Sequence, residues 1–115
     1  MTSMNRKPTI NVICNNINHP LLKPVLAGIE EEGIPVQTDF RKEDDWVKAA
    51  YLAAEESVLG VGMALDENGT VIIHYYRLNE NEPLFKRNQV DSSLAKQMGI
   101  NAARLVKGKP FDLSL

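Results

Sequence analysis

The sequence has a single cysteine and no long apolar run. Cys14 cannot form an internal disulfide, so the chain fits a reducing compartment, and we expect it in the cytoplasm. No stretch approaches the roughly 18 apolar residues of a membrane span, and the N-terminus lacks the apolar core of a secretory signal. The 13 lysines and arginines are scattered and the net charge is −2. We therefore expect neither a membrane nor a nucleic acid as partner.

Short motifs that carry chemistry are also missing. Spacings such as HxxxH or CxxC, which indicate a self-contained metal site, do not occur. The loop at 15–20, NNINHP, lies where an open parallel sheet commonly binds ligands, but it has no glycine to form a phosphate-binding nest. We interpret His19 in this loop as solvent-exposed in preference to an anion contact. Cys14 is interpreted as a small buried hydrophobe and His74 as a hydrogen-bonded strand residue.

What is present is a regular alternation of strand and helix patterns. Strands are predicted at 9–14, 34–38, 58–65 and 70–76 with a short edge strand at 84–87, and helices at 20–32, 45–57 and 91–107. This order predicts a three-layer α/β/α sandwich around a mixed, mostly parallel sheet of four to five strands with one antiparallel strand. Residues 1–115 are expected to form a single domain. Gly60 and Gly62 lie inside a strand pattern, so we interpret them as permitting close helix packing and not as a dinucleotide fingerprint.

Two helices carry patterns that raise further questions. The helix at 45–57 has one small-residue face that core packing explains, and beside it an apolar flank that suggests a partner surface. The last helix places Asn101 within an apolar stripe, either buried with hydrogen-bond partners or capping a second short helix after Gly99. The small-residue face comprises Trp46, Ala49, Ala50, Ala53 and Ser57, and the flank comprises Val47, Tyr51 and Ala54.

Three glutamates end the helix at 20–32, directly before Gly33. Each anion at a helix C-terminus costs about 0.3–1 kcal/mol when exposed at low salt. A helical projection from the apolar stripe places Glu30 and Glu32 on its two flanks, where we expect them to be solvated, and Glu31 opposite it, pointing outward. A cation would stabilise Glu31 there. Because one carboxylate binds a divalent ion poorly, we expect a partner to complete such a site.

Several segments resemble a known family, the small (beta) subunits of adenosylcobalamin-dependent diol/glycerol dehydratase reactivases. The segments are LAGIEEEGIP at 26–35, GVGMA at 60–64, PLF at 83–85 and GINAARLVKGKPF at 99–111. The last is the most specific, and the resemblance runs from about residue 20 to the C-terminus. Roles for 15–19 and 39–48 do not follow from it.

The resemblance implies a chaperone-like subunit of propanediol utilization with no catalytic activity of its own. It implies pairing with a large ATPase subunit that holds ATP or ADP. It also implies that the small subunit replaces the dehydratase beta subunit on the dehydratase alpha subunit, so that damaged cobalamin is released. Glu31 occupies the position of a carboxylate that binds a Mg²⁺ ion shared with the large subunit. The small subunit alone is expected to bind no cofactor. Glu30, Glu32, Val47 and Tyr51 are further interface candidates. A homodimer in isolation and an association with a bacterial microcompartment stay open.

Two alternatives stay open beside this interpretation. The first is the beta (medium) subunit of the dehydratase itself, which is typically longer at its N-terminus. The second is a small flavodoxin-like hydrolase or thiol enzyme that uses Cys14, against which the missing glycine-rich loop argues.

Overall fold

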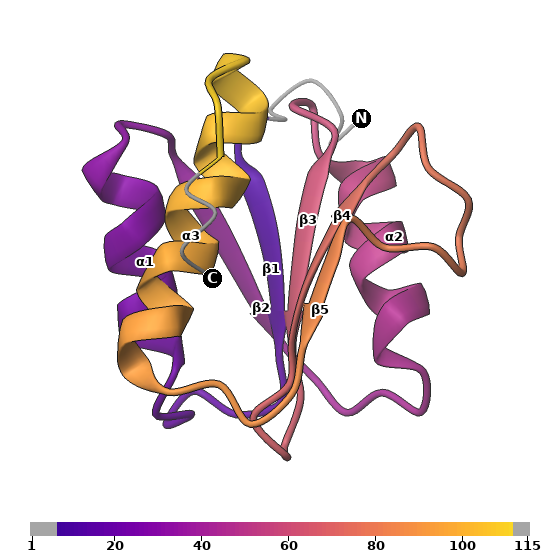
Figure 1. Ribbon diagram of the computed structural model, residues 1–115. Coiled ribbons are helices and arrows are strands. Elements are labelled where there is room, and N and C mark those ends of the chain that lie inside the picture. The colour runs from indigo at the N-terminus through magenta and orange to yellow at the C-terminus, as the bar shows by residue number, and fades with distance from the viewer. Residues whose placement is uncertain (1–6, 112–115) are drawn as a thin grey trace.

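A computed structural model describes residues 7–111 as one five-stranded sheet with three helices packed on it (Figure 1). Residues 1–6 and 112–115 of the domain predicted to span 1–115 lie outside the described residues. The elements in chain order are β1 (Ile10–Cys14), α1 (Leu22–Glu31), β2 (Val36–Phe40), α2 (Trp46–Glu56), β3 (Val61–Leu65), β4 (Val71–Tyr75), β5 (Phe85–Arg87) and α3 (Ser92–Lys107).

The strands lie in the order β2-β1-β3-β4-β5. β1 pairs in parallel with β2 and β3, whereas β4 is antiparallel to both β3 and β5. Of the five strands in the described part of the chain, β4 is therefore the one that runs against the others. The predicted mixed, mostly parallel sheet with one antiparallel strand is confirmed.

The order of the first three strands explains the layers. The chain moves outward from β1 to the edge strand β2, then returns past β1 to β3. Parallel crossovers share one hand, so two crossovers in opposite directions place α1 and α2 on opposite faces of the sheet. α3 then packs beside α1, which leaves α2 alone on its face (Figure 1). The three-layer sandwich is confirmed.

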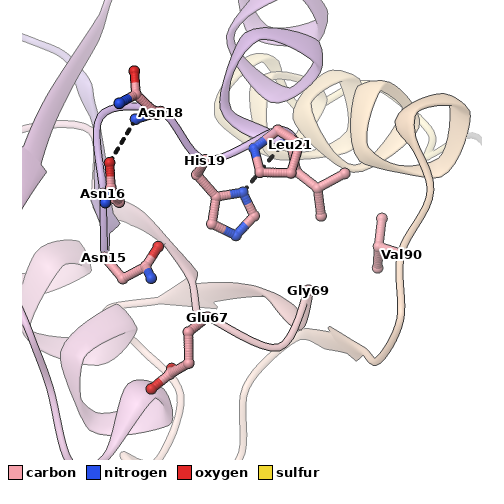
Figure 2. A pocket seen from close by; sticks show the side chains of 9 residues that line it. Asn15, Asn16, Asn18, His19, Leu21, Glu67, Gly69 and Val90 are labelled. Carbon is pink, nitrogen blue, oxygen red and sulfur yellow. Dashed lines mark hydrogen bonds between the residues drawn. The ribbon is translucent and has the colours of Figure 1, made fainter.

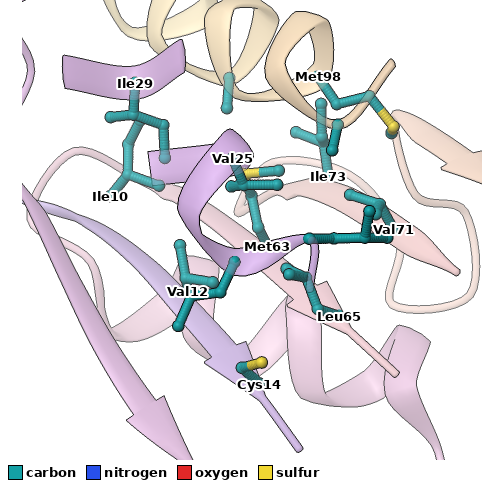
Figure 3. Packing of buried hydrophobic residues seen from close by; sticks show 14 of the residues in the cluster. Ile10, Val12, Cys14, Val25, Ile29, Met63, Leu65, Val71, Ile73 and Met98 are labelled. Carbon is teal, nitrogen blue, oxygen red and sulfur yellow. The ribbon is translucent and has the colours of Figure 1, made fainter. Parts of the chain in front are cut away.

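The two faces of the sheet are filled differently. The face beneath α1 and α3 holds large apolar side chains, and Val25, Ile29 and Met98 of the helices meet them (Figure 3). The face beneath α2 is filled by small residues, with alanines of the helix against Ile13, Ala64 and Ile72. The large residues of the first face are Ile10, Val12, Val61, Met63, Leu65, Val71 and Ile73.

A glycine lets α2 lie directly on the sheet. A Cβ atom on Gly62 would lie 2.4 Å from the Ala54 nitrogen and 2.5 Å from the Ala50 oxygen, closer than atoms can approach. The predicted packing role of Gly62 is confirmed. Ala54, expected on an outer flank, is instead fully buried because α2 sits so close that this flank also meets the sheet. The strand expected at 58–65 begins only at Val61, since Gly60 has a φ of +78° and turns the chain.

α1 and α3 approach each other through a reciprocal pair of glycines. A Cβ on Gly28 would lie 2.2 Å from the Lys96 carbonyl oxygen, and one on Gly99 would lie 2.2 Å from the Val25 carbonyl oxygen. Each helix therefore presents bare backbone to the other, which only glycine allows. This contact fixes which residues of α3 face the end of α1.

The helix ends follow the expected capping chemistry. Asp45 accepts a hydrogen bond from Lys48 N at 3.0 Å, and Asp91 accepts one from Leu94 N at 2.8 Å. Gly108 ends α3 in the left-handed conformation. α3 is continuous, so the alternative of a second helix capped by Asn101 is wrong. Asn101 is fully buried within the helix, as the other alternative required.

The close approach of α1 and α3 at Gly28 leads us to predict how a substitution there changes the stability of the protein. Gly28→Ala should destabilise the protein by about 1–3 kcal/mol, because the added methyl group must push the backbones of α1 and α3 apart. Chemical denaturation followed by circular dichroism measures this change. Ala27→Leu, which enlarges the exposed neighbour on the same helix, should change stability by less than about 0.5 kcal/mol. Equal effects of the two substitutions would show that the close contact is not a constraint.

Candidate functional site

The glutamates at the end of α1 face a basic surface of α3. Glu32, the C-cap residue, lies within 4 Å of three cationic groups: Lys107 Nζ at 3.3 Å, Lys109 Nζ at 3.5 Å and Arg104 Nε at 3.7 Å. Its side chain is only 11% exposed. Lys107 Nζ also donates a hydrogen bond to the Glu32 carbonyl oxygen at 2.9 Å, which satisfies a backbone acceptor at the helix end.

These cations change the acidity of Glu32. The hydrogen bond from Lys107 lowers the pKa of the Glu32 carboxyl below its ordinary value of 4.5. Burial opposes this shift, whereas the charges of Lys109, Lys107 and Arg104 add to it. Glu32 was expected to be solvated, and this expectation is wrong. The projection counted only the stripe that faces the sheet, whereas buried Gly28 shows that α1 has a second covered face against α3.

Glu31 has a different environment. Its side chain is 52% exposed, and its Oε2 lies 2.9 Å from Lys96 Nζ of α3. The predicted outward direction is thus only partly right, since the carboxylate leans towards α3. Glu30 is exposed, as expected.

Glu31 suits a metal site that a partner completes. Within residues 7–111, no three His, Cys, Asp or Glu side chains lie close enough together to hold a metal ion. Mg²⁺ commonly takes one or two carboxylates together with phosphate oxygens and water. A half-exposed carboxylate at the end of a helix is accessible to such an ion and fits one ligand position.

A second feature lies at the carboxyl ends of β1 and β3. There a pocket of about 330 Å³ opens where the chain leaves β1 for α1, at the point where the first two crossovers diverge (Figure 2). The pocket is lined by Asn15, Asn16, Asn18, His19, Pro20, Leu21, Glu67, Gly69 and Val90. Open parallel sheets commonly bind ligands at such a loop, and the pocket lies there, but the sequence assigned no role to residues 15–19.

His19 does not have the solvent-exposed role that we expected. Its ring is half-buried, and Nδ1 accepts a hydrogen bond from Leu21 N at 3.0 Å. Nε2 lies 2.8 Å from the Asp66 carbonyl oxygen and donates to it in the matching neutral tautomer. His19 therefore ties the start of α1 to the β3–β4 turn. The expectation failed because Asp66 is 47 residues away in sequence.

Cys14 and His74 have structural roles. Cys14 is buried, its Sγ lies 3.3 Å from the Asn16 carbonyl oxygen, and burial raises the pKa of its thiol above 9.0. His74 is also buried, and its Nε2 lies 3.0 Å from the Glu80 carbonyl oxygen. A buried thiol with a raised pKa is a poor nucleophile. The arrangement therefore disfavours the thiol-enzyme alternative.

The interface candidates on α2 are partly covered by their own domain. Val47 packs against the cluster of Ala50, Ala64 and Ile72. The Tyr51 ring meets His74 edge-on at 5.1 Å, and its hydroxyl donates to Glu55 Oε2 at 3.2 Å. Both side chains are half-buried, so each keeps a surface that a partner could contact.

Comparisons with known proteins agree with this architecture. Residues 7–112 match the family model for the dehydratase medium subunit. The propanediol dehydratase-reactivating factor small subunit of Salmonella typhimurium is 41% identical over 112 residues, which is 96% of each chain. The diol dehydratase-reactivating factor small subunit of Klebsiella michiganensis is 44% identical over 92 residues, covering 79% of this chain and 73% of the relative.

Two solved structures have the same fold. The first, a diol dehydratase-reactivating factor complexed with ADP and Mg²⁺, superposes with a TM-score of 0.85 at 39% identity over 92% of this chain and 98% of that chain. The second, a glycerol dehydratase reactivase, has a TM-score of 0.84 at 26% identity over 92% and 97% of the two chains. The chain belongs to the family of small subunits of diol and glycerol dehydratase-reactivating factors, as its sequence motifs suggested. Within residues 7–111, no helix has the length and apolarity needed to cross a bilayer.

Glu32 makes stability dependent on pH. Because its pKa is lower in the folded state than in the unfolded chain, its contribution is complete above about pH 4.5 and is lost as the pH falls through the folded-state pKa. We expect Glu32→Gln to lose less stability than the parent protein when the pH is lowered through this range. Urea unfolding midpoints measured between about pH 6 and about pH 3 show the difference. Glu30→Gln serves as the control, and identical pH profiles for the parent and Glu32→Gln would contradict the assignment.

Cys14 should react slowly in the native protein. Its burial and raised pKa predict labelling by a thiol reagent at neutral pH about a hundredfold or more slower than in the urea-unfolded chain. Absorbance kinetics with an aromatic disulfide reagent measure both rates. Equal rates would restore the thiol-enzyme alternative.

Proposed function

We propose that this chain is the non-catalytic small subunit of a chaperone-like, ATP-dependent factor that reactivates a diol or glycerol dehydratase. It works through its surfaces. It pairs with a large ATPase subunit, to whose nucleotide site Glu31 contributes one ligand of Mg²⁺. It then exchanges with the dehydratase beta subunit on the alpha subunit, so that damaged cobalamin leaves the enzyme.

The observation that carries the Mg²⁺ part of the proposal is the environment of Glu31. This carboxylate is half-exposed and has one cationic contact, whereas the neighbouring Glu32 is enclosed by three cations. The similar diol dehydratase-reactivating factor was solved with ADP and Mg²⁺, which supports a nucleotide-bound divalent ion in the assembled factor. Mg²⁺ bound there would neutralise phosphate charge and bridge the two subunits.

The exchange step is supported by the fold. Residues 7–112 match the family model for the dehydratase medium subunit, so the chain shares an architecture with a subunit of the enzyme. Two subunits with one fold can occupy the same position on a common partner. On α2, Val47 and Tyr51 are half-buried and Leu52 is exposed, so this helix offers apolar side chains for such contacts.

The same match also supports a second candidate, the beta (medium) subunit of the dehydratase itself. The similarity to reactivating-factor small subunits over 96% of each chain favours the first. Co-purification from the native organism distinguishes them. An ATPase partner supports the reactivating factor, and a cobalamin-binding partner in a stable complex supports the dehydratase subunit.

Glu31→Ala tests the Mg²⁺ role. We expect the variant to fold normally, because Glu31 is half-exposed, and to lose about tenfold or more of the affinity that Mg²⁺ adds to pairing with the ADP-bound large subunit. Titration calorimetry with and without Mg²⁺ measures this increment. Glu30→Ala removes the same charge from the adjacent position and should leave the Mg²⁺ increment intact. An unchanged increment in Glu31→Ala would exclude Glu31 as a ligand.

A further inference from the structure

Lys96 is the residue that α3 places against Glu31. Its carbonyl oxygen lies at the glycine contact, 2.2 Å from where a Cβ on Gly28 would be. Gly28 precedes Glu31 by three residues, about one helical turn along α1. The position of Lys96 relative to Glu31 is thus set by backbone packing and not by the flexible side chains alone.

The ion pair leaves Glu31 accessible. Lys96 Nζ lies 2.9 Å from Glu31 Oε2, and the two side chains stay 47% and 52% exposed. A carboxylate has two oxygens, so one can accept from Lys96 while the other binds a second partner. Carboxylates that bind metal ions are commonly held in this way by a hydrogen-bonding neighbour, which fixes their orientation.

The other cations of this surface do not have this relation to Glu31. Arg104, Lys107 and Lys109 contact Glu32, and together they cover it. The cations of this surface therefore divide into a group that contacts Glu32 and a lysine, Lys96, that contacts the half-exposed Glu31.

We propose that Lys96 is a positioning residue for Glu31, holding its carboxylate in the direction in which it binds the divalent ion shared with the large subunit. The inference rests on the proposed function and deepens it. Lys96 acts through Glu31, so its effect requires both Glu31 and Mg²⁺.

The experiment is a double-mutant cycle on the full-length small subunit. Parent, Lys96→Met, Glu31→Gln and the double variant are titrated into the ADP-bound large subunit with and without Mg²⁺. Methionine keeps the length of the side chain and removes the charge. We expect Lys96→Met to lower the Mg²⁺ increment in affinity by about two- to fivefold, the range for an exposed ion pair, and to have no further effect beside Glu31→Gln.

Two further variants separate positioning from general loss of charge. Lys96→Arg keeps a cationic donor and should restore most of the increment, whereas Lys109→Met removes a charge beside Glu32 and should leave the increment unchanged. Thermal unfolding of every variant confirms that each is folded.

Several results would overturn the proposal. If Lys96→Met lowered the affinity for the large subunit equally in the Glu31→Gln background, or equally without Mg²⁺, Lys96 would contact the large subunit directly. A rise in the increment would show that Lys96 competes with the ion, and no change would show that the ion pair has no role. A separate result would contradict the proposed function itself. In that case Glu31→Gln would leave the gain in affinity that Mg²⁺ provides unchanged.

Discussion

The close approach of α1 and α3 at Gly28 and Gly99 is the constraint on which the rest of the candidate site depends. It brings the backbones of α1 and α3 closer than any side chain would permit. From this crossing, α3 reaches the end of α1 on two sides, with Lys96 beside Glu31 and Arg104 and Lys107 beside Glu32. A small shift between the helices would separate these pairs, because each depends on which turn of one helix faces which turn of the other.

The same contact brings cations to two of the three acids at the negative end of the helix dipole, Glu31 and Glu32. Within α1 alone they are unfavourable, since its last turn contains no basic residue. The compensation is tertiary. Lys107 serves both the Glu32 side chain and the Glu32 carbonyl oxygen, so one cation offsets an anion and an unpaired backbone acceptor. The acids thus favour the docked pair of helices over the isolated one.

Much of the fold follows from local patterns in the sequence, because strand and helix periodicities, aspartate caps and turn glycines act over a few residues. The caps at Asp45 and Asp91 and the left-handed Gly108 belong to this class. Two of the errors have a different cause. Glu32 and His19 were both expected to be solvated, and both are held by groups that lie 47 to 77 residues away in sequence.

The candidate site shows the same division. A helical projection placed Glu31 on the outward side of α1, since that direction depends on α1 alone, and its carboxylate is half-exposed. It could not identify Lys96 as its neighbour, which depends on how α3 crosses α1. Gly28 was the available signal, because a glycine inside an amphipathic helix commonly marks a close approach.

The unequal faces of the sheet have a mechanical consequence. Beneath α1 and α3, large side chains interlock, so separating those helices from the strands would expose much apolar surface. Beneath α2 the interface consists mainly of alanines against Ile13, Ile72 and Gly62, which expose less apolar surface when separated. The sheet with α1 and α3 is thus the more tightly packed part of the domain, and it keeps Glu31 and its cations in place. The layer formed by α2 buries less apolar surface against the sheet. Strain imposed by a large partner would be absorbed first at the α2 layer, while the acidic end of α1 keeps its geometry.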